Sequence, residues 1–90
     1  MKNEDELRER LSELEHQQWT KWSQDIARDL KDFLVVLEGM KLTAYPIYEK
    51  LKSRLQRWET YWKPYNELDY GTQEEDREWA DKAILIMKKR

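Results

Sequence analysis

Residues 4–39 read EDELRERLSELEHQQWTKWSQDIARDLKDFLVVLEG, and this stretch decides the fold class. Its apolar residues recur mostly at steps of three and four, which places them on one face of an α-helix. The stripe comprises Leu7, Leu11, Leu14, Trp22, Ile26, Leu30, Phe33, Leu34 and Leu37. The pattern predicts a helix from about residue 4 to about residue 38, either continuous or broken near Thr20–Ser23, with Gly39 as its stop.

A second helix is predicted after a short link. Thr43 is a suitable N-cap, and Pro46 is tolerated in a first helical turn because a backbone N–H would have no partner there. Pro64 is expected to end this helix. The predicted stripe comprises Ile47, Leu51, Leu55, Trp58 and Trp62.

A third helix is predicted close to the end of the sequence. The stretch from Tyr65 to Gly71 has no helical period and is expected to be an ordered loop. Thr72 and Glu75 then form a capping box, with Tyr70 as the staple before it, so the helix should run from about residue 73 to about residue 88. Its expected inward residues are Trp79, Ala80, Ala83, Ile84 and Met87. The sequence thus predicts a compact all-α bundle of three to four helices, with an ordered Pro-Tyr loop before the last one.

The composition indicates a single domain, residues 1–90, of modest core and generous polar surface. Hydrophobic residues make up 39% and charged residues 40%, and five Trp and five Tyr supply much of the area available for burial. The formal charge of −2 argues against a partner that is duplex nucleic acid. The apolar runs are far shorter than the roughly 20 residues that span a bilayer, and no signal peptide is evident. We therefore expect a cytoplasmic protein without a membrane partner (host cytoplasm if it is encoded by a phage).

The residue types present argue against catalysis and against a cofactor. Without cysteine there is no thiol nucleophile, disulfide or thiolate zinc site, and a single histidine leaves only oxygen ligands for a metal. The glycines, Gly39 and Gly71, form no phosphate-binding loop. Carboxylate pairs are numerous, but in so charged a chain they indicate solvation rather than acid–base chemistry. We expect no enzymatic activity, no cofactor and no metal.

Two segments concentrate the aromatic and special residues. The first contains His16 and Trp19, which are three apart and therefore share a helix face. His16 is either a contact to a ligand, with Trp19 as a stacking surface, or a half-buried histidine satisfied by a backbone carbonyl. In the second, Pro64 would direct Tyr65 either to the rim of a pocket or into a packing corner.

Asp76 and Arg77 belong to the predicted first turn of the third helix. There Asp76 would be favoured by the helix dipole, whereas a cation so early in a helix suggests a specific role for Arg77. One alternative is an ion pair with Asp76, with Glu67 or with a carboxylate on the first helix. The other is a fork for a phosphate or carboxylate of a ligand. The sequence leaves both open.

These segments resemble the ryanodine-receptor-type (RyR) domain, in a small stand-alone form of the kind found in prokaryotes and phages. The resemblance covers about residues 13–87 and rests on three motifs in order: His16-Gln17-Gln18-Trp19, Pro64-Tyr65-Asn66-Glu67-Leu68, and Asp76-Arg77-Glu78 with Ala80. It implies a mostly helical, non-enzymatic domain that binds a nucleotide-like ligand. The ligand-binding residues that it implies are His16, Trp19, Tyr65, Asp76 and Arg77.

Two functions follow as expectations. The first is a binding module, a phage sponge or bacterial sensor, that captures a small anionic ligand containing a ring. The second is a protein–protein interaction or assembly module that uses an exposed aromatic face with a polar rim. A homo-oligomer is included in the second, and a coiled coil through Leu7, Leu11 and Leu14 is one form of it.

Overall fold

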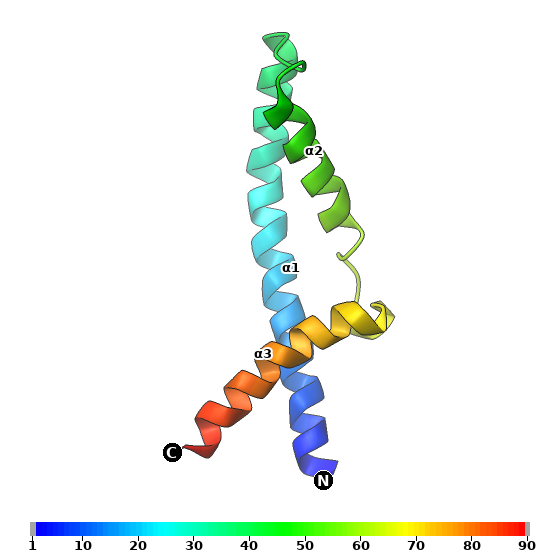
Figure 1. Cartoon of the computed structure of the whole chain (residues 1–90), viewed down its shortest axis with the longest axis vertical. Helices are drawn as coiled ribbons and strands as arrows, with labels where there is room; N and C mark the ends of the chain where they lie inside the picture. The colour runs from blue at the N-terminus through cyan, green and yellow to red at the C-terminus, as the bar shows by residue number, and fades with distance from the viewer. Residues whose placement is uncertain (1, 90) are drawn as a thin grey trace. The chain divides into compact units, whose positions relative to one another are not determined.

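The computed structural model describes residues 2–89, and all regular structure within them is helical (Figure 1). The elements are α1 (Lys2–Gly39), α2 (Pro46–Glu59), the short 3-10 helix η1 (Tyr65–Glu67) and α3 (Tyr70–Lys88). The predicted all-α class is confirmed, and η1 occupies the predicted ordered loop before the last helix. No helix in this part of the chain is both long enough and apolar enough to cross a bilayer.

Helix α1 is continuous over 38 residues, so the break considered near Thr20–Ser23 does not occur. The helix ends at Gly39 as predicted, although the left-handed residue that terminates it is Lys41, with φ of 59°. The amide of Leu42 donates to the carbonyl of Leu37 at 2.8 Å and the amide of Lys41 donates to Glu38 at 3.1 Å. These two bonds form a Schellman motif, which satisfies carbonyls that the helix end would otherwise leave unpaired.

The described chain divides into two compact units. One unit combines the chain through Trp19 with the chain from Lys63 onward, and the other is Thr20–Trp62. The division leaves α1 contributing its first half to one unit and its second half to the other. All five predicted ligand-binding residues fall in the first unit.

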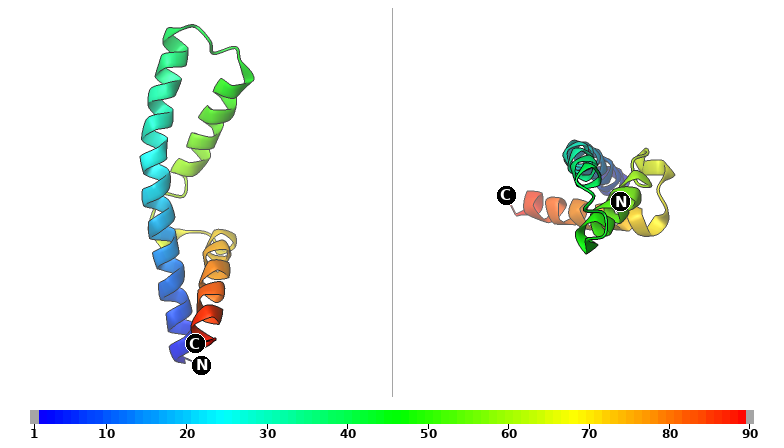
Figure 2. Two further views of the ribbon diagram at one scale, coloured as in Figure 1. Left: turned by 90° about the vertical axis from the view of Figure 1, so that its left-hand side faces the viewer. Right: turned by 90° about the horizontal axis from the view of Figure 1, so that it is seen from above.

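In the unit Thr20–Trp62, α2 runs back along the second half of α1 (Figure 2). Its core consists of Ala27, Leu34, Leu37, Tyr48 and Leu55, with Leu30, Leu42, Leu51, Trp58 and Trp62 packed against them. Burying each large side chain contributes roughly 1.5–3 kcal/mol, so this cluster is the main source of cohesion in the unit.

Both predicted ends of the second helix are wrong. Helix α2 begins at Pro46, and the residue before it is Tyr45, which makes no side-chain capping bond, so Thr43 is not the N-cap. The helix ends at Glu59 rather than near Pro64, because the amides of the next three residues donate to carbonyls three residues back and so leave the α-helical pattern. The hydroxyl of Thr60 also donates to the carbonyl of Arg57 at 2.6 Å. Trp62 therefore reaches the core from the turn and not from the helix.

The third helix begins earlier than predicted. Asp69 is the N-cap of α3, and its carboxylate accepts from the amide of Thr72 at 3.3 Å and from the Thr72 hydroxyl at 2.5 Å. The predicted capping box at Thr72 is therefore wrong, and Tyr70 is the first helical residue, not a staple. Ala80 and Ile84 are buried as expected, whereas Trp79 and Met87 are 57% and 48% exposed.

The buried face of α1 also differs from the predicted stripe in its first half. Its buried positions follow one track of the helix with steps of three, four or seven: Ser12, His16, Ser23, Ala27, Leu34 and Leu37. Leu14, Trp22 and Phe33 are exposed, because Trp22 and Phe33 lie to one side of this track and Leu14 lies opposite it. The buried side chains of α1 are therefore polar in its first half and mainly apolar in its second half.

Candidate functional site

His16 is held in a defined orientation by contacts on both ring nitrogens. The residue is only 4% exposed, and its Nε2 lies 2.8 Å from the backbone carbonyl oxygen of Lys63. Because a carbonyl can only accept, Nε2 carries the hydrogen in this pair. Nδ1 then faces the Oδ2 of Asp76 at 3.6 Å. The Trp19 ring stacks beside the imidazole, with ring centroids 6.1 Å apart.

Asp76 has a carboxylate oxygen whose hydrogen-bonding capacity is not satisfied within residues 2–89. Its Oδ2 is buried and makes no hydrogen bond to any other described residue. Burial raises the pKa of the Asp76 carboxyl above its ordinary value, while the nearby His16 opposes that rise. The geometry therefore places a carboxyl with a raised pKa 3.6 Å from a histidine nitrogen, in a part of the unit with little exposure to solvent.

Arg77 is bound by two carboxylates. Its Nε and Nη2 donate to the two oxygens of Glu9 at 2.7 and 3.3 Å, and its Nη1 donates to Glu74 at 2.8 Å. The bonds to Glu9 and, second, to Glu74 raise the pKa of Arg77. The bonds from Arg77 in turn lower the pKa of Glu9. The Arg77 side chain is only 15% exposed. The ion-pair alternative, with a carboxylate on the first helix, is the one found.

Tyr65 completes the same cluster. Its hydroxyl donates to the Oε2 of Glu9 at 2.9 Å, and the Arg77 guanidinium lies 6.0 Å from its ring centroid. Burial, followed by the bond to Glu9, raises the pKa of Tyr65. Gln73 links the two residues, because its Nε2 donates to the Tyr65 carbonyl at 2.9 Å and its Oε1 accepts from Arg77 at 3.4 Å.

The five predicted ligand-binding residues thus form two clusters within one unit. His16, Trp19 and Asp76 make one, and Tyr65 and Arg77 make the other. The sequence prediction missed Glu9, which joins Tyr65 to Arg77. Asp76 and Arg77 are also not in the first turn of their helix, because α3 begins at Tyr70, so the helix-dipole argument for them is wrong.

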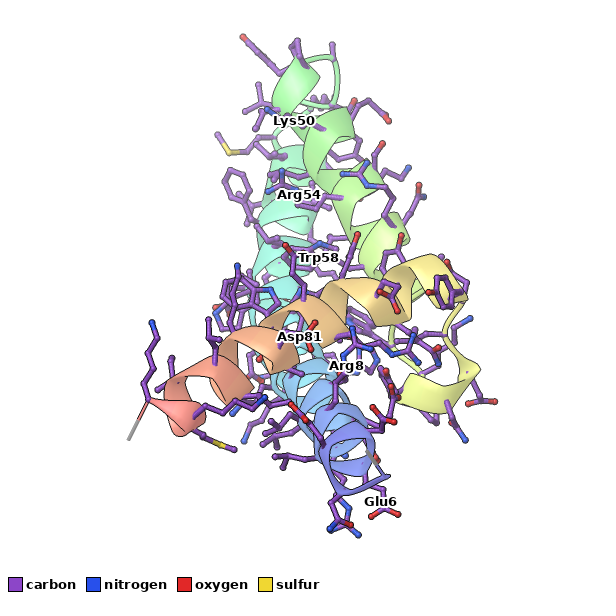
Figure 3. All side chains as sticks on the ribbon, turned by 60° about the horizontal axis from the view of Figure 1, so that its bottom comes forward. Glu6, Arg8, Lys50, Arg54, Trp58 and Asp81 are labelled. Atoms are coloured by element: carbon purple, nitrogen blue, oxygen red, sulfur yellow. The ribbon has the colours of Figure 1, made fainter. Side chains whose placement is uncertain are left out.

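Two open depressions lie elsewhere in this unit. The larger, about 330 Å³, is lined by Arg8, Gly71, Glu74, Glu75, Glu78 and Asp81. The smaller, about 270 Å³, adjoins it at Arg8 and Asp81, whose side chains form an ion pair with N–O distances of 2.7 and 3.1 Å (Figure 3). Neither depression is lined by a predicted ligand-binding residue. The walls of the larger one are mainly acidic and do not suit an anion, whereas the smaller one combines acidic, basic and apolar side chains. No cluster of three or more metal-ligating side chains occurs among residues 2–89.

Large apolar side chains on the surface are the other notable feature. On α1, Trp22 is 56% exposed, Phe33 46%, Val36 53% and Met40 63%. On α3, Trp79 is 57% exposed and is covered on one side by Lys82, whose Nζ lies 4.3 Å from the ring centroid. The sequence did not predict this exposure for Trp22, Phe33 or Trp79.

Comparison of this chain with protein-family models, with curated proteins and with solved structures found no match. The resemblance to the ryanodine-receptor-type domain therefore remains a prediction from the sequence motifs alone.

Proposed function

We propose that this protein is a non-enzymatic protein-interaction module whose contact surface is an exposed apolar stripe on α1. The stripe, called the outer stripe below, consists of Trp22, Ile26, Phe33, Val36 and Met40. Four of these five side chains are between 46% and 63% exposed, and Ile26 is half-buried. This exposure is the observation that carries the proposal.

The outer stripe has the spacing of a helix-packing seam. Its members follow one another at steps of three, four or seven, which is the repeat by which one helix packs against another. At about 100° per residue, the stripe lies about a quarter of a turn from the residues that pack against α2. Helix α1 therefore has two adjacent apolar faces in the unit Thr20–Trp62, and α2 covers one of them.

Leaving these side chains in water is unfavourable. A large aromatic ring buries roughly 150–250 Å² when it is fully covered. Covering the exposed half of Trp22 alone removes on the order of 100 Å² from water, which is worth about 2.5 kcal/mol. Single exposed hydrophobic residues are ordinary, but several in one line are typical of an interface.

The arrangement at Arg77 favours this proposal over capture of a nucleotide-like anion. A ligand phosphate would have to displace Glu9 and Glu74 from the guanidinium, and the two freed carboxylates would then face the incoming negative charge. Those two carboxylates already accept the hydrogen bonds and neutralise the charge of the guanidinium, as a bound anion would do.

Two neighbouring valines provide a matched test. Val36 belongs to the outer stripe, whereas Val35 is 65% exposed and lies on a different side of α1. Val36→Gln should weaken association of the purified chain, with itself in sedimentation velocity or with a partner in a capture assay. Val35→Gln should leave association unchanged. Equal behaviour of the two variants would remove the support for the outer stripe as the contact surface.

A further inference from the structure

We infer that the occupant of the outer stripe is a second copy of this chain. The two Thr20–Trp62 hairpins would be related by a two-fold axis that runs along the helices, so that α1 of each copy lies on α2 of the other. This inference rests on the proposed function and specifies its partner. Three observations support it: which side chains share a face of the hairpin, how charge is divided across that face, and the height at which the charges lie.

Helix α2 contributes a second ridge to the face that carries the outer stripe. The rings of Trp22 and Trp58 are in contact, with centroids 6.1 Å apart, so Trp58 lies on the stripe side of the hairpin. Steps of three and four from Trp58 back along α2 reach Arg54, Lys50 and Ile47, which therefore share its side. Figure 3 shows Lys50, Arg54 and Trp58 following one another along α2. The ion pair between Lys31 and Glu59 (3.2 Å) marks the opposite side.

Charge is divided between the two halves of this face. On α1, Asp29 interrupts the outer stripe between Ile26 and Phe33, and Asp32 lies beside it. On α2, the charged residues of the ridge are Lys50 and Arg54. All four are exposed, and none of them forms an ion pair with another described residue. The face thus has an apolar half with acidic groups and a basic half.

The heights of these charges match across the proposed two-fold axis. Within one hairpin, the side chains of Glu38 and Tyr48 meet, because the Tyr48 hydroxyl donates to Glu38 at 2.9 Å, and those of Ser23 and Trp62 meet, because the Trp62 Nε1 donates to Ser23 at 2.9 Å. Counting along both helices between these two contacts brings residues 29–32 to about the same position along the hairpin as residues 53–56. A two-fold rotation about an axis parallel to the helices leaves the position of each residue along the hairpin unchanged, and it places α1 of one copy opposite α2 of the other. Asp29 and Asp32 then face Arg54 of the second copy.

A two-fold axis perpendicular to the helices would bring like charges together and is therefore disfavoured. An axis across the helices would lay α1 on α1 and α2 on α2. Lys50 and Arg54 would then approach the same basic ridge of the second copy, and Asp29 would approach an acidic one. Like charges brought together at an interface are costly, and such contacts exclude partners and orientations.

Apolar contacts agree with the first arrangement. Val36 and Met40 would lie against Ile47 of the second copy, which is 47% exposed, and against the aliphatic stem of its Lys50. Asp29, the charged position within the otherwise apolar outer stripe, would fix the register of the two copies by pairing with Arg54. The product is a four-helix bundle in which each helix runs antiparallel to its neighbours.

Charge reversal tests the pairing in the full-length chain by sedimentation equilibrium. Asp29→Lys and Arg54→Glu should each raise the dimer dissociation constant about tenfold or more, since two-fold symmetry repeats each change. An equimolar mixture of the two variants should restore dimerisation, because Lys meets Glu and Asp meets Arg in the mixed pair. Gln24→Lys, on the far side of α1, is the control and should have little effect. Circular dichroism checks that each variant remains helical.

Disulfide trapping distinguishes the two arrangements, since the chain contains no cysteine. A mixture of Asp29→Cys and Arg54→Cys chains should form mixed disulfide dimers, and Asp29→Cys alone should not. Ready cross-linking of Asp29→Cys alone, or equal effects of Asp29→Lys and Gln24→Lys, would overturn the inference. A chain that stays monomeric yet loses a different partner on Val36→Gln but not on Val35→Gln would overturn it and leave the proposed function standing.

Discussion

Glu9 and Arg77 lie 68 residues apart in the sequence and are joined by two charge-assisted hydrogen bonds of 2.7 and 3.3 Å. The pair ties the first half of α1 to α3. Tyr65 adds a third bond to the same carboxylate, so three elements meet at Glu9. Arg77 thereby acts as a structural residue in this fold, which leads to a specific expectation for acid stability.

Glu9→Gln should destabilise the protein at neutral pH by on the order of 1 kcal/mol, a modest effect because the Glu9 side chain is 45% exposed. The pKa of Glu9 is lowered in the fold, so its contribution is present above the ordinary glutamate pKa and is lost as pH falls through the folded-state value. Urea denaturation from pH 7 to pH 3 should show a smaller acid-induced loss in the variant. Identical pH profiles for both proteins would contradict this role for Glu9.

Asp76 should behave in the opposite way. Its pKa is raised by burial, so between the ordinary aspartate pKa and the raised folded-state pKa the folded state holds a proton that the unfolded state has released, and stability is lost as pH rises through this range. Asp76→Asn should therefore raise the free energy of unfolding at pH 7 by about 1 kcal/mol, and the gain should vanish below the ordinary aspartate pKa. Thermal denaturation at pH 7 and pH 3 measures both. A variant that is less stable at pH 7 would show that the charged carboxylate is needed beside His16.

The apolar pattern predicted the helices well but predicted the inward face of α1 poorly. Leucine positions suggest a stripe through Leu7, Leu11 and Leu14, whereas the buried positions are Ser12 and His16. Hydrophobicity cannot identify a polar inward face. The available signal was spacing: steps of four and seven back from the buried Ala27 lead through Ser23 to His16 and Ser12.

The candidate site was predicted in part, for a similar reason. The five residues named from the three motifs lie in one unit, where His16 is close to Asp76 and Tyr65 is close to Arg77, and their binding of a ligand stays a prediction. Glu9 was not singled out because it is one of 19 acidic residues, and nothing local distinguishes a carboxylate that binds an arginine from one that faces water. Only the partner across the fold makes that distinction.

Because Arg77 is paired with two carboxylates, we predict that nucleotides do not bind to it. Because Glu9 and Glu74 occupy the guanidinium, millimolar nucleotides or cyclic dinucleotides should leave the melting temperature of the full-length chain unchanged. A ligand present at 100 times its dissociation constant would instead add about 2.7 kcal/mol of stability, which a thermal-shift assay detects readily.

Arg77→Lys serves as the control for that screen. Lysine keeps the charge but loses the bidentate bond to Glu9, so the variant should melt at a lower temperature with or without nucleotide. A nucleotide-induced shift in the wild type that disappears in Arg77→Lys would favour ligand capture over the interaction function proposed above.

Ser23 should be critical to the unit Thr20–Trp62 although it is small and polar. It is completely buried, and its Oγ accepts the indole N–H of Trp62 at 2.9 Å while donating to the Thr20 carbonyl at 3.1 Å. Ser23→Ala removes this acceptor from the half-buried Trp62, and the expected loss is about 1 kcal/mol in urea denaturation. Ser53→Ala, on α2 and only half-buried, is the control and should cost much less. Trp62→Phe removes the donor, so adding Ser23→Ala to it should cost less than Ser23→Ala alone; equal costs would show that the bond to Trp62 does not account for the effect.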